Sequence, residues 1–224
     1  MYIMLATYLD LSYPIGILAC YVSNPLSEYE DALFHLLGYL AYTIDDTLIY
    51  RKDGENHQDP GIMDCYSDAD WAGEEHSGGS TSGMAILKNG AAISWSSKQQ
   101  GIVSTSTMEA EYIALFSTTQ YAIWLASLET QFHLEAINSP EPCIPNTYCD
   151  NQAALAMANR GDMSSFKCSR FMNVKYHYIN TQWKPATSPS MMLGLKTIVR
   201  ATLSLCEFAS EAVSTLGCRC LTYP

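Results

Sequence analysis

The chain has 224 residues, 48% of them hydrophobic, which is enough for one medium domain with additional segments or for two small units. It contains no long uncharged apolar run, which excludes an ordinary transmembrane helix, and its apolar start lacks the basic region of a signal peptide. The formal net charge of −11 disfavours a broad basic surface of the kind that binds phosphate backbones. We therefore expect an intracellular chain, cytoplasmic or nuclear and not secreted, with no membrane association. We expect its eight cysteines to be reduced thiols.

The first fifty residues are expected to be helical. Ser27 is placed to cap a helix over residues 28–42. The apolar face of this predicted helix consists of Leu33, Leu36, Leu37 and Leu40. Residues 51–61 are polar and rich in turn-forming residues, which indicates a linker. The predicted boundaries are a helical segment over 1–50, the linker over 51–61, an α/β domain over 62–184 and a tail over 185–224.

Strand patterns dominate the start of the predicted α/β domain. Residues 61–68 predict a first strand that ends at Asp68. Residues 81–97 form two apolar runs around Asn89-Gly90, a dipeptide that favours the tight turn of a β-hairpin. The domain is therefore predicted to begin with three consecutive strands.

Helical patterns follow the hairpin. Ser106 and Glu109 have capping-box spacing and open a predicted helix over 108–134, with a break at 117–119 that divides it in two. Residues 146–150 predict a fourth strand. Residues 151–160 then predict a helix that stops at Gly161. A parallel pairing of the first and fourth strands requires a crossover, and the intervening helical stretch is the candidate for it.

Three acidic residues occupy positions that such a fold brings together. Asp68 and Asp150 end strands predicted to be neighbours, and Glu111 lies in the first turns of the helix that crosses between them. Converging carboxylates repel one another unless divalent cations neutralise them, and oxygen ligands suit Mg²⁺ or Mn²⁺. Two such ions are the usual apparatus for cleaving phosphodiesters. Other readings stay open: Asp68 and Asp70 as turn residues, Asp150 as a helix cap, and Glu111 as an ordinary helix residue.

Five stretches of the chain resemble, in order and spacing, the ribonuclease H domain of Ty1/copia-type retrotransposon Pol polyproteins. They are residues 66–73 (YSDADWAG), 80–83 (STSG), 92–100 (AISWSSKQQ), 106–115 (STMEAEYIAL) and 148–158 (YCDNQAALAMA). The resemblance covers residues 62–180. Residues 5–50 are similar to the end of the reverse transcriptase region that precedes that domain. The chain therefore resembles a fragment of a larger polyprotein that lacks the polymerase palm.

The resemblance implies a ribonuclease H-like mixed sheet flanked by helices, with a short helical N-terminal segment and an atypical C-terminal tail. It implies metal-dependent cleavage of the RNA strand in RNA–DNA hybrids, a substrate recognised largely by shape. Asp68, Glu111 and Asp150 match the family's first three catalytic acids, which hold two Mg²⁺ or Mn²⁺ ions. The oligomeric state is not predicted.

Two departures from the family pattern leave the activity open. Phe171 stands in the segment 170–173 where the family usually has a histidine, and no motif for the family's fourth acid follows Ile179. Glu207 and Glu211 are the available substitutes, without a supporting motif. The cations available to hold a hybrid are Lys98, Lys167, Arg170 and Lys175. We therefore keep two hypotheses: a metal-dependent ribonuclease H weakened at its second ion, and an inactive retroelement remnant that acts as a binding module.

Overall fold

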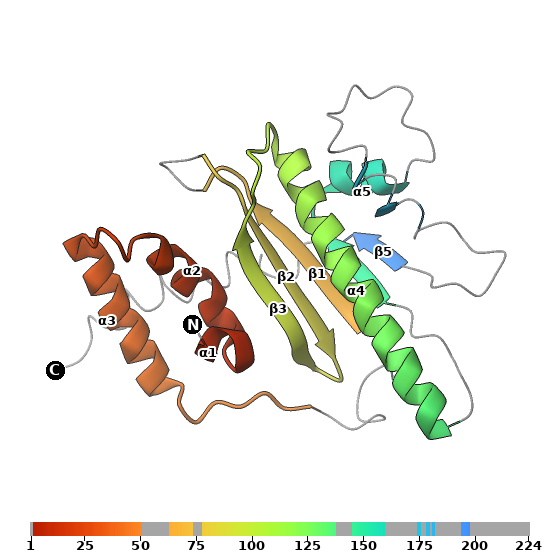
Figure 1. Ribbon diagram of the computed structural model, residues 1–224, viewed down its shortest axis with the longest axis horizontal. Coiled ribbons are helices and arrows are strands. Elements are labelled where there is room, and N and C mark those ends of the chain that lie inside the picture. Colours follow the sequence, from red (N-terminus) through yellow and green to blue (C-terminus); the bar gives the residue numbers. More distant parts are fainter. Residues whose placement is uncertain are drawn as a thin grey trace.

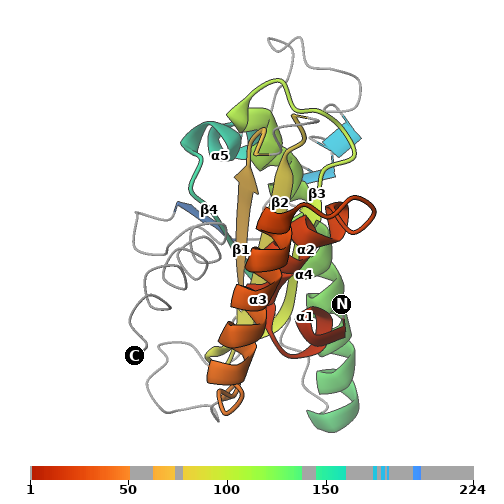
Figure 2. The ribbon, with the colours of Figure 1, turned by 90° about the vertical axis from the view of Figure 1, so that its left-hand side faces the viewer.

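The structure, a computed structural model, describes residues 2–50, 63–73, 78–137, 145–159, 174–175, 178–179, 181 and 194–197. Its centre is a β-sheet that lies between the N-terminal helices and the long helix α4 (Figures 1 and 2). Several sequence predictions lie outside the described residues: the linker 51–61, the helix stop at Gly161, segment 170–173, and Glu207 and Glu211. Within the described ranges, none of the helices combines the length and apolar character that a bilayer-spanning segment needs.

The N-terminal segment is helical, as predicted. It contains α1 (Tyr2–Ala6), the short 3-10 helix η1 (Leu9–Leu11), α2 (Ser12–Cys20) and α3 (Ser27–Tyr42). The Tyr8 hydroxyl donates to the Thr43 carbonyl at 2.9 Å and joins the two ends of this segment. The Trp95 indole donates to the Met4 carbonyl at 2.6 Å, which fixes α1 against the sheet.

The prediction for α3 was correct in extent and wrong in two details. Leu26, in an extended conformation, occupies the cap position, and Ser27 is the first helical residue. The Leu26 carbonyl accepts the first backbone bonds of the helix, from Tyr29 and Glu30. Of the predicted apolar face, Leu36 is buried, whereas Leu33 and Leu37 are exposed.

The sheet has five strands in the order β3-β2-β1-β4-β5. They are β1 (Met63–Asp70), β2 (Thr81–Lys88), β3 (Ala91–Gln99), β4 (Pro145–Cys149) and β5 (Gly194–Thr197). The pairs β1–β2 and β2–β3 are antiparallel, and β1–β4 and β4–β5 are parallel. The expected mixed sheet flanked by helices is therefore confirmed.

Three details of the strands refine the sequence reading. The predicted hairpin turn is confirmed, since Asn89 and Gly90 both have positive φ angles, 53° and 82°. β1 continues to Asp70, so the prediction that it ends at Asp68 was wrong by two residues. β5 comes from the tail 185–224, where the sequence predicted no strand.

Helix α4 (Thr107–Ile137) is one continuous helix, so the predicted break at 117–119 was wrong. The Ser117 and Thr118 hydroxyls donate to the carbonyls of Ile113 and Ala114, one turn earlier, at 3.1 and 3.0 Å. These residues break helices when their side chains compete for backbone groups outside the helix. Here they bond within it, and the helix continues.

The predicted start of α4 is confirmed. The Ser106 hydroxyl accepts a hydrogen bond from the Glu109 backbone N–H at 3.2 Å, as a capping residue does. The Glu109 carboxylate in turn accepts a bond from the Thr105 N–H at 2.8 Å. Both bonds satisfy backbone donors at the start of the helix and fix the first turn, directly before Glu111.

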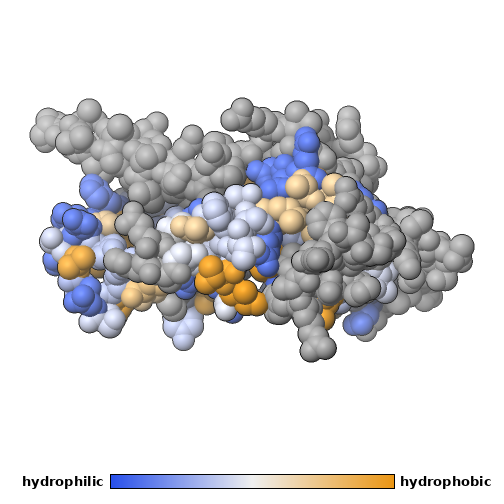
Figure 3. Space-filling model, turned by 90° about the horizontal axis from the view of Figure 1, so that it is seen from above, coloured by the Kyte–Doolittle hydropathy of each residue, from blue (hydrophilic) through white to orange (hydrophobic). Residues whose placement is uncertain are grey.

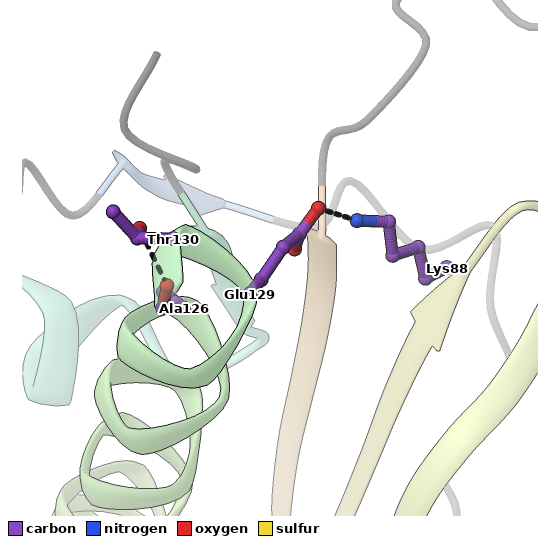
Figure 4. A network of polar contacts seen from close by, with 4 residues as sticks. All are labelled: Lys88, Ala126, Glu129 and Thr130. Atoms are coloured by element: carbon purple, nitrogen blue, oxygen red, sulfur yellow. Dashed lines mark hydrogen bonds and ion pairs between the residues drawn. The ribbon is translucent and has the colours of Figure 1, made fainter. Parts of the chain in front are cut away.

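Two apolar clusters hold α4 against the sheet. One consists of Met63, Cys65, Ile86, Ala122 and Ala126, in which two alanines let α4 approach β1 and β2 closely. The other contains Tyr112 and Leu115 of α4, Cys149 of β4, and Leu155 of helix α5 (Gln152–Asn159). An ion pair between Lys88 of β2 and Glu129 of α4 adds a polar link, and Thr130 bonds back to Ala126 (Figure 4).

Candidate active site

The parallel pairing of β1 and β4 brings the first and third predicted acids to one edge of the sheet. Ser67 lies opposite Cys149 in the register, and each is followed directly by an aspartate, Asp68 and Asp150. Asp68 is half-buried within the strand, which excludes the reading of Asp68 as a turn residue. Asp150 follows the last residue of β4 and is exposed.

The second predicted acid reaches this edge from α4. Glu111 is 7% exposed, which is unusual for the ordinary helix residue that the sequence also allowed. Burial, followed by the charges of Asp68 and Asp150, raises the pKa of Glu111 to about 8, and a hydrogen bond from the Ala69 N–H opposes this shift. The three carboxylates therefore influence one another electrostatically at the carboxyl end of β1.

Cys149 is a member of this group that the sequence reasoning missed. Its fully buried Sγ donates to Glu111 Oε2 at 4.0 Å. Single ligand atoms of Glu111, Cys149 and Asp150 lie within 4.8 Å of one another. Burial and the neighbouring Glu111 raise the pKa of the Cys149 thiol to about 12, so the thiol stays protonated as a donor. The sequence signal for Cys149 was its position directly before Asp150, on the predicted fourth strand.

Two further alternatives from the sequence are settled here. The Asn151 side chain, not that of Asp150, caps α5, because it accepts from the Ala154 N–H at 3.0 Å. The reading of Asp70 as a turn residue was wrong, since it is the last residue of β1 and pairs with Thr81. A Cβ added at Gly73 would overlap the Asp70 carboxylate, so a larger residue there requires the Asp70 side chain to move.

Comparison with known proteins finds homologues over most of the chain. No family model matches the chain. It is 34% identical over 179 residues, 80% of its length, to the retrovirus-related Pol polyprotein from transposon TNT 1-94 of Nicotiana tabacum. It is also 34% identical over 174 residues to the polyprotein from transposon RE2 of Arabidopsis thaliana, and 26% over 166 residues to a Ty1 Gag-Pol polyprotein of Saccharomyces cerevisiae. Its homologues over most of its length are therefore Ty1/copia-type Pol polyproteins.

The chain spans only 12% and 11% of the lengths of the tobacco and Arabidopsis polyproteins. It is 40% identical over 125 residues to secreted RxLR effector protein 161 of Plasmopara viticola, and covers 84% of that protein. Because the chain covers so little of these polyproteins, their activities cannot be assigned to it from the alignment alone.

Solved structures with a similar arrangement include ribonuclease H1 from Halobacterium salinarum, at 16% identity and a TM-score of 0.42 over 69% of this chain and 99% of that one. The N-terminal ribonuclease H domain of rv2228c from Mycobacterium tuberculosis aligns at 13% identity and 0.44, over 71% and 98%. The fold class of the chain, a mixed sheet flanked by helices, rests on its own strand order and register.

Proposed function

We propose that this domain is a metal-dependent ribonuclease H that cleaves the RNA strand of RNA–DNA hybrids. Asp68, Glu111 and Asp150 are the proposed catalytic residues and the ligands of Mg²⁺ or Mn²⁺. One observation carries the proposal: Glu111 is buried beside two further carboxylates that β1 and β4 bring to the same edge. The family relationship supports the choice of substrate, since the chain aligns with a segment of Pol polyproteins.

The residues at this edge fit a divalent cation. A buried carboxylate next to like charges is unstable when ionised, and a cation removes that penalty. Carboxylate oxygens are the ligands that Mg²⁺ prefers. When bound, such ions supply an activated water and stabilise the leaving oxygen.

The chain's own groups orient these ligands. The Ala69 N–H and the Cys149 thiol both donate to the Glu111 carboxylate, which fixes its direction. Because Ala69 belongs to β1 and Cys149 to β4, both parallel strands hold the carboxylate that α4 supplies. Asp68 belongs to β1 and Asp150 directly follows β4, so we expect the same two strands to position all three acids.

A second candidate function is a binding module without catalysis. The net charge of −11 favours it, because few cations are available to hold a nucleic acid. The sequence after Ile179 also lacks the motif of a fourth acid, so we expect the second metal ion to bind more weakly. Each tenfold loss of rate corresponds to about 1.4 kcal/mol of barrier.

The test is a cleavage assay on a labelled RNA–DNA hybrid with Mg²⁺ or Mn²⁺, run beside Asp68→Asn. A matched control is Asp64→Asn, on the same strand, where the carboxylate accepts a bond from Tyr148 at 3.1 Å. We expect cleavage by the wild type and by Asp64→Asn, and a loss of at least about a hundredfold in Asp68→Asn. Calorimetric titration with Mn²⁺ gives a second readout, since Asp68→Asn should weaken metal binding. Equal cleavage by the wild type and Asp68→Asn, or no cleavage by either protein, refutes the proposal that the domain is a ribonuclease H.

A further inference from the structure

Three exposed aromatic side chains form a stripe along α4. They are Tyr121, Trp124 and Phe132, which are 47%, 57% and 61% exposed, and we call them the α4 stripe. Because an α-helix turns by about 100° per residue, the three lie within about 80° of one another around the helix axis. Ala122 and Ala126, which pack against the sheet, lie on a different side of the same helix. The stripe is therefore a continuous aromatic surface that the sheet does not cover.

The far end of α4 extends past the sheet. The helix has 31 residues and β1 has eight, which correspond to lengths of about 46 Å and about 26 Å. Figure 1 shows the end of α4 continuing beyond the ends of the strands. Glu129 is ion-paired with Lys88, the last residue of β2, and Phe132 lies beyond this link. Helical turns without tertiary packing are marginally stable in water, so a further contact at this end of α4 would stabilise them.

The α4 stripe also differs from the rest of the chain in charge. The chain has 23 acidic and 12 basic residues, so two copies repel one another in general. Residues 112–128, however, contain no charged residue, and Glu129 is neutralised by its ion pair. Two copies therefore approach each other through this part of α4 with little repulsion.

Other exposed apolar residues lie in less suitable surroundings. Phe34 of α3 is 64% exposed, but residues 1–50 contain six acidic residues and no lysine or arginine. The end of the molecule where β1 finishes and α4 begins has hydrophobic residues lying among hydrophilic ones, as seen from above the view of Figure 1 (Figure 3). Self-association is therefore least opposed at the α4 stripe.

We propose that the α4 stripe is the contact surface between two copies of this chain, packed as antiparallel helices about a twofold axis. An axis near residues 126–127 sets Tyr121 of each copy opposite Phe132 of the other, with both Trp124 side chains between these contacts. In such a symmetric interface each contact occurs twice. Because Glu111 lies ten residues before Tyr121, about 15 Å along the helix, the carboxylate edge stays open in the dimer.

The exposed aromatic area indicates how strong this association is. A half-exposed aromatic side chain offers roughly 100 Å², so the six in the interface bury about 600 Å² before their neighbours on the helix are counted. Interfaces below about 1,200 Å² in total are typical of weak association. We therefore expect a dimer that dissociates on dilution.

The test is analytical ultracentrifugation of the full chain between about 1 and 200 μM, with a reducing agent because Cys20 is exposed. The measured mass of the wild type should rise from 24.8 kDa toward twice that value. Trp124→Glu and Phe132→Glu should each stay at 24.8 kDa throughout, because each places two acids in an apolar contact. The matched control is Phe34→Glu, the same change at a helical phenylalanine of similar exposure, which should associate as the wild type does.

A mixing experiment tests the antiparallel arrangement. Tyr121→Glu and Phe132→Lys should each be monomeric alone and form a dimer when mixed, because the introduced acid of one chain faces the introduced lysine of the other. Circular dichroism identifies any variant that fails to fold, and the remaining variants then decide the matter. A wild type that stays monomeric at the highest concentration overturns the inference and leaves the stripe to a different partner. Loss of the dimer in Phe34→Glu but not in Phe132→Glu also overturns it, as does a mixture that stays monomeric.

Discussion

Glu111→Gln should stabilise the metal-free protein at neutral pH, although it removes a proposed catalytic group. The wild-type carboxyl group is buried beside Asp68 and Asp150, which raises its pKa to about 8. Glutamine has nearly the same shape and an oxygen that can accept the Ala69 N–H. The variant therefore keeps the packing and removes the cost of placing an acid there.

The magnitude follows from the difference between the folded and unfolded pKa values. The ordinary value is 4.5 and the folded value about 8, so the folded protein holds this proton more tightly than the unfolded chain does. Stability of the wild type therefore falls as pH rises from 4.5 to 8, by about 1.4 kcal/mol per pH unit. Between pH 5 and pH 7 the advantage of Glu111→Gln should grow by about 3 kcal/mol.

The assay is urea unfolding of both proteins at a series of pH values, with a chelator present. Glu30→Gln, the same change at an exposed position of α3, controls for the loss of one net charge. Adding Mg²⁺ should stabilise the wild type and have less effect on Glu111→Gln. A pH-independent difference between the two proteins would show that Glu111 is not held beside the other carboxylates as described.

Three further changes test the local structure around the site. Ser106→Ala removes the cap of α4 and should lower the free energy of unfolding by about 1 kcal/mol, measured by urea unfolding. Lys88→Met and Glu129→Gln, combined in a double-mutant cycle, should show a coupling of about 1 kcal/mol that weakens with salt; a coupling of zero would mean that the ion pair adds nothing to stability. Gly73→Ala places a methyl group on the Asp70 carboxylate and should lower the melting temperature more in the wild type than in an Asp70→Ala background, whereas an equal effect in both backgrounds would contradict the close approach.

Local signals in the sequence were enough to predict most of the sheet and the start of its main helix. Asn89-Gly90 specifies its own turn because both residues accept positive φ angles, and Ser106 specifies a helix start because its hydroxyl satisfies a backbone donor. The break predicted at 117–119 failed because Ser117 and Thr118 bond to carbonyls within the helix. β5 could not be predicted from its four residues, because its strand structure depends on pairing with β4.

The candidate site was only partly visible in the sequence. Strand and helix positions predicted that Asp68, Glu111 and Asp150 would meet at one edge. In the structure, the charges of Asp68 and Asp150 both raise the pKa of Glu111, and the cluster of close ligand atoms contains Glu111 and Asp150 with Cys149 but not Asp68; the shared site and its catalytic role stay predictions. The contact of the Cys149 thiol with Glu111 depends on how closely α4 packs on β4. Such contacts arise from tertiary packing, which no local pattern encodes.

The parallel pairing at the centre of the sheet sets an order of events during synthesis on the ribosome. Asp64 and Asn146 face each other on β1 and β4 although they lie 82 residues apart. β2 and β3 are synthesised soon after β1, whereas β4, which pairs with the other edge of β1, is synthesised later. Until then the nascent chain presents an open strand edge, the kind of surface that recruits chaperones or neighbouring unfolded chains. A stalled or truncated product that ends before Pro145 would therefore be prone to aggregation as well as lacking the third carboxylate.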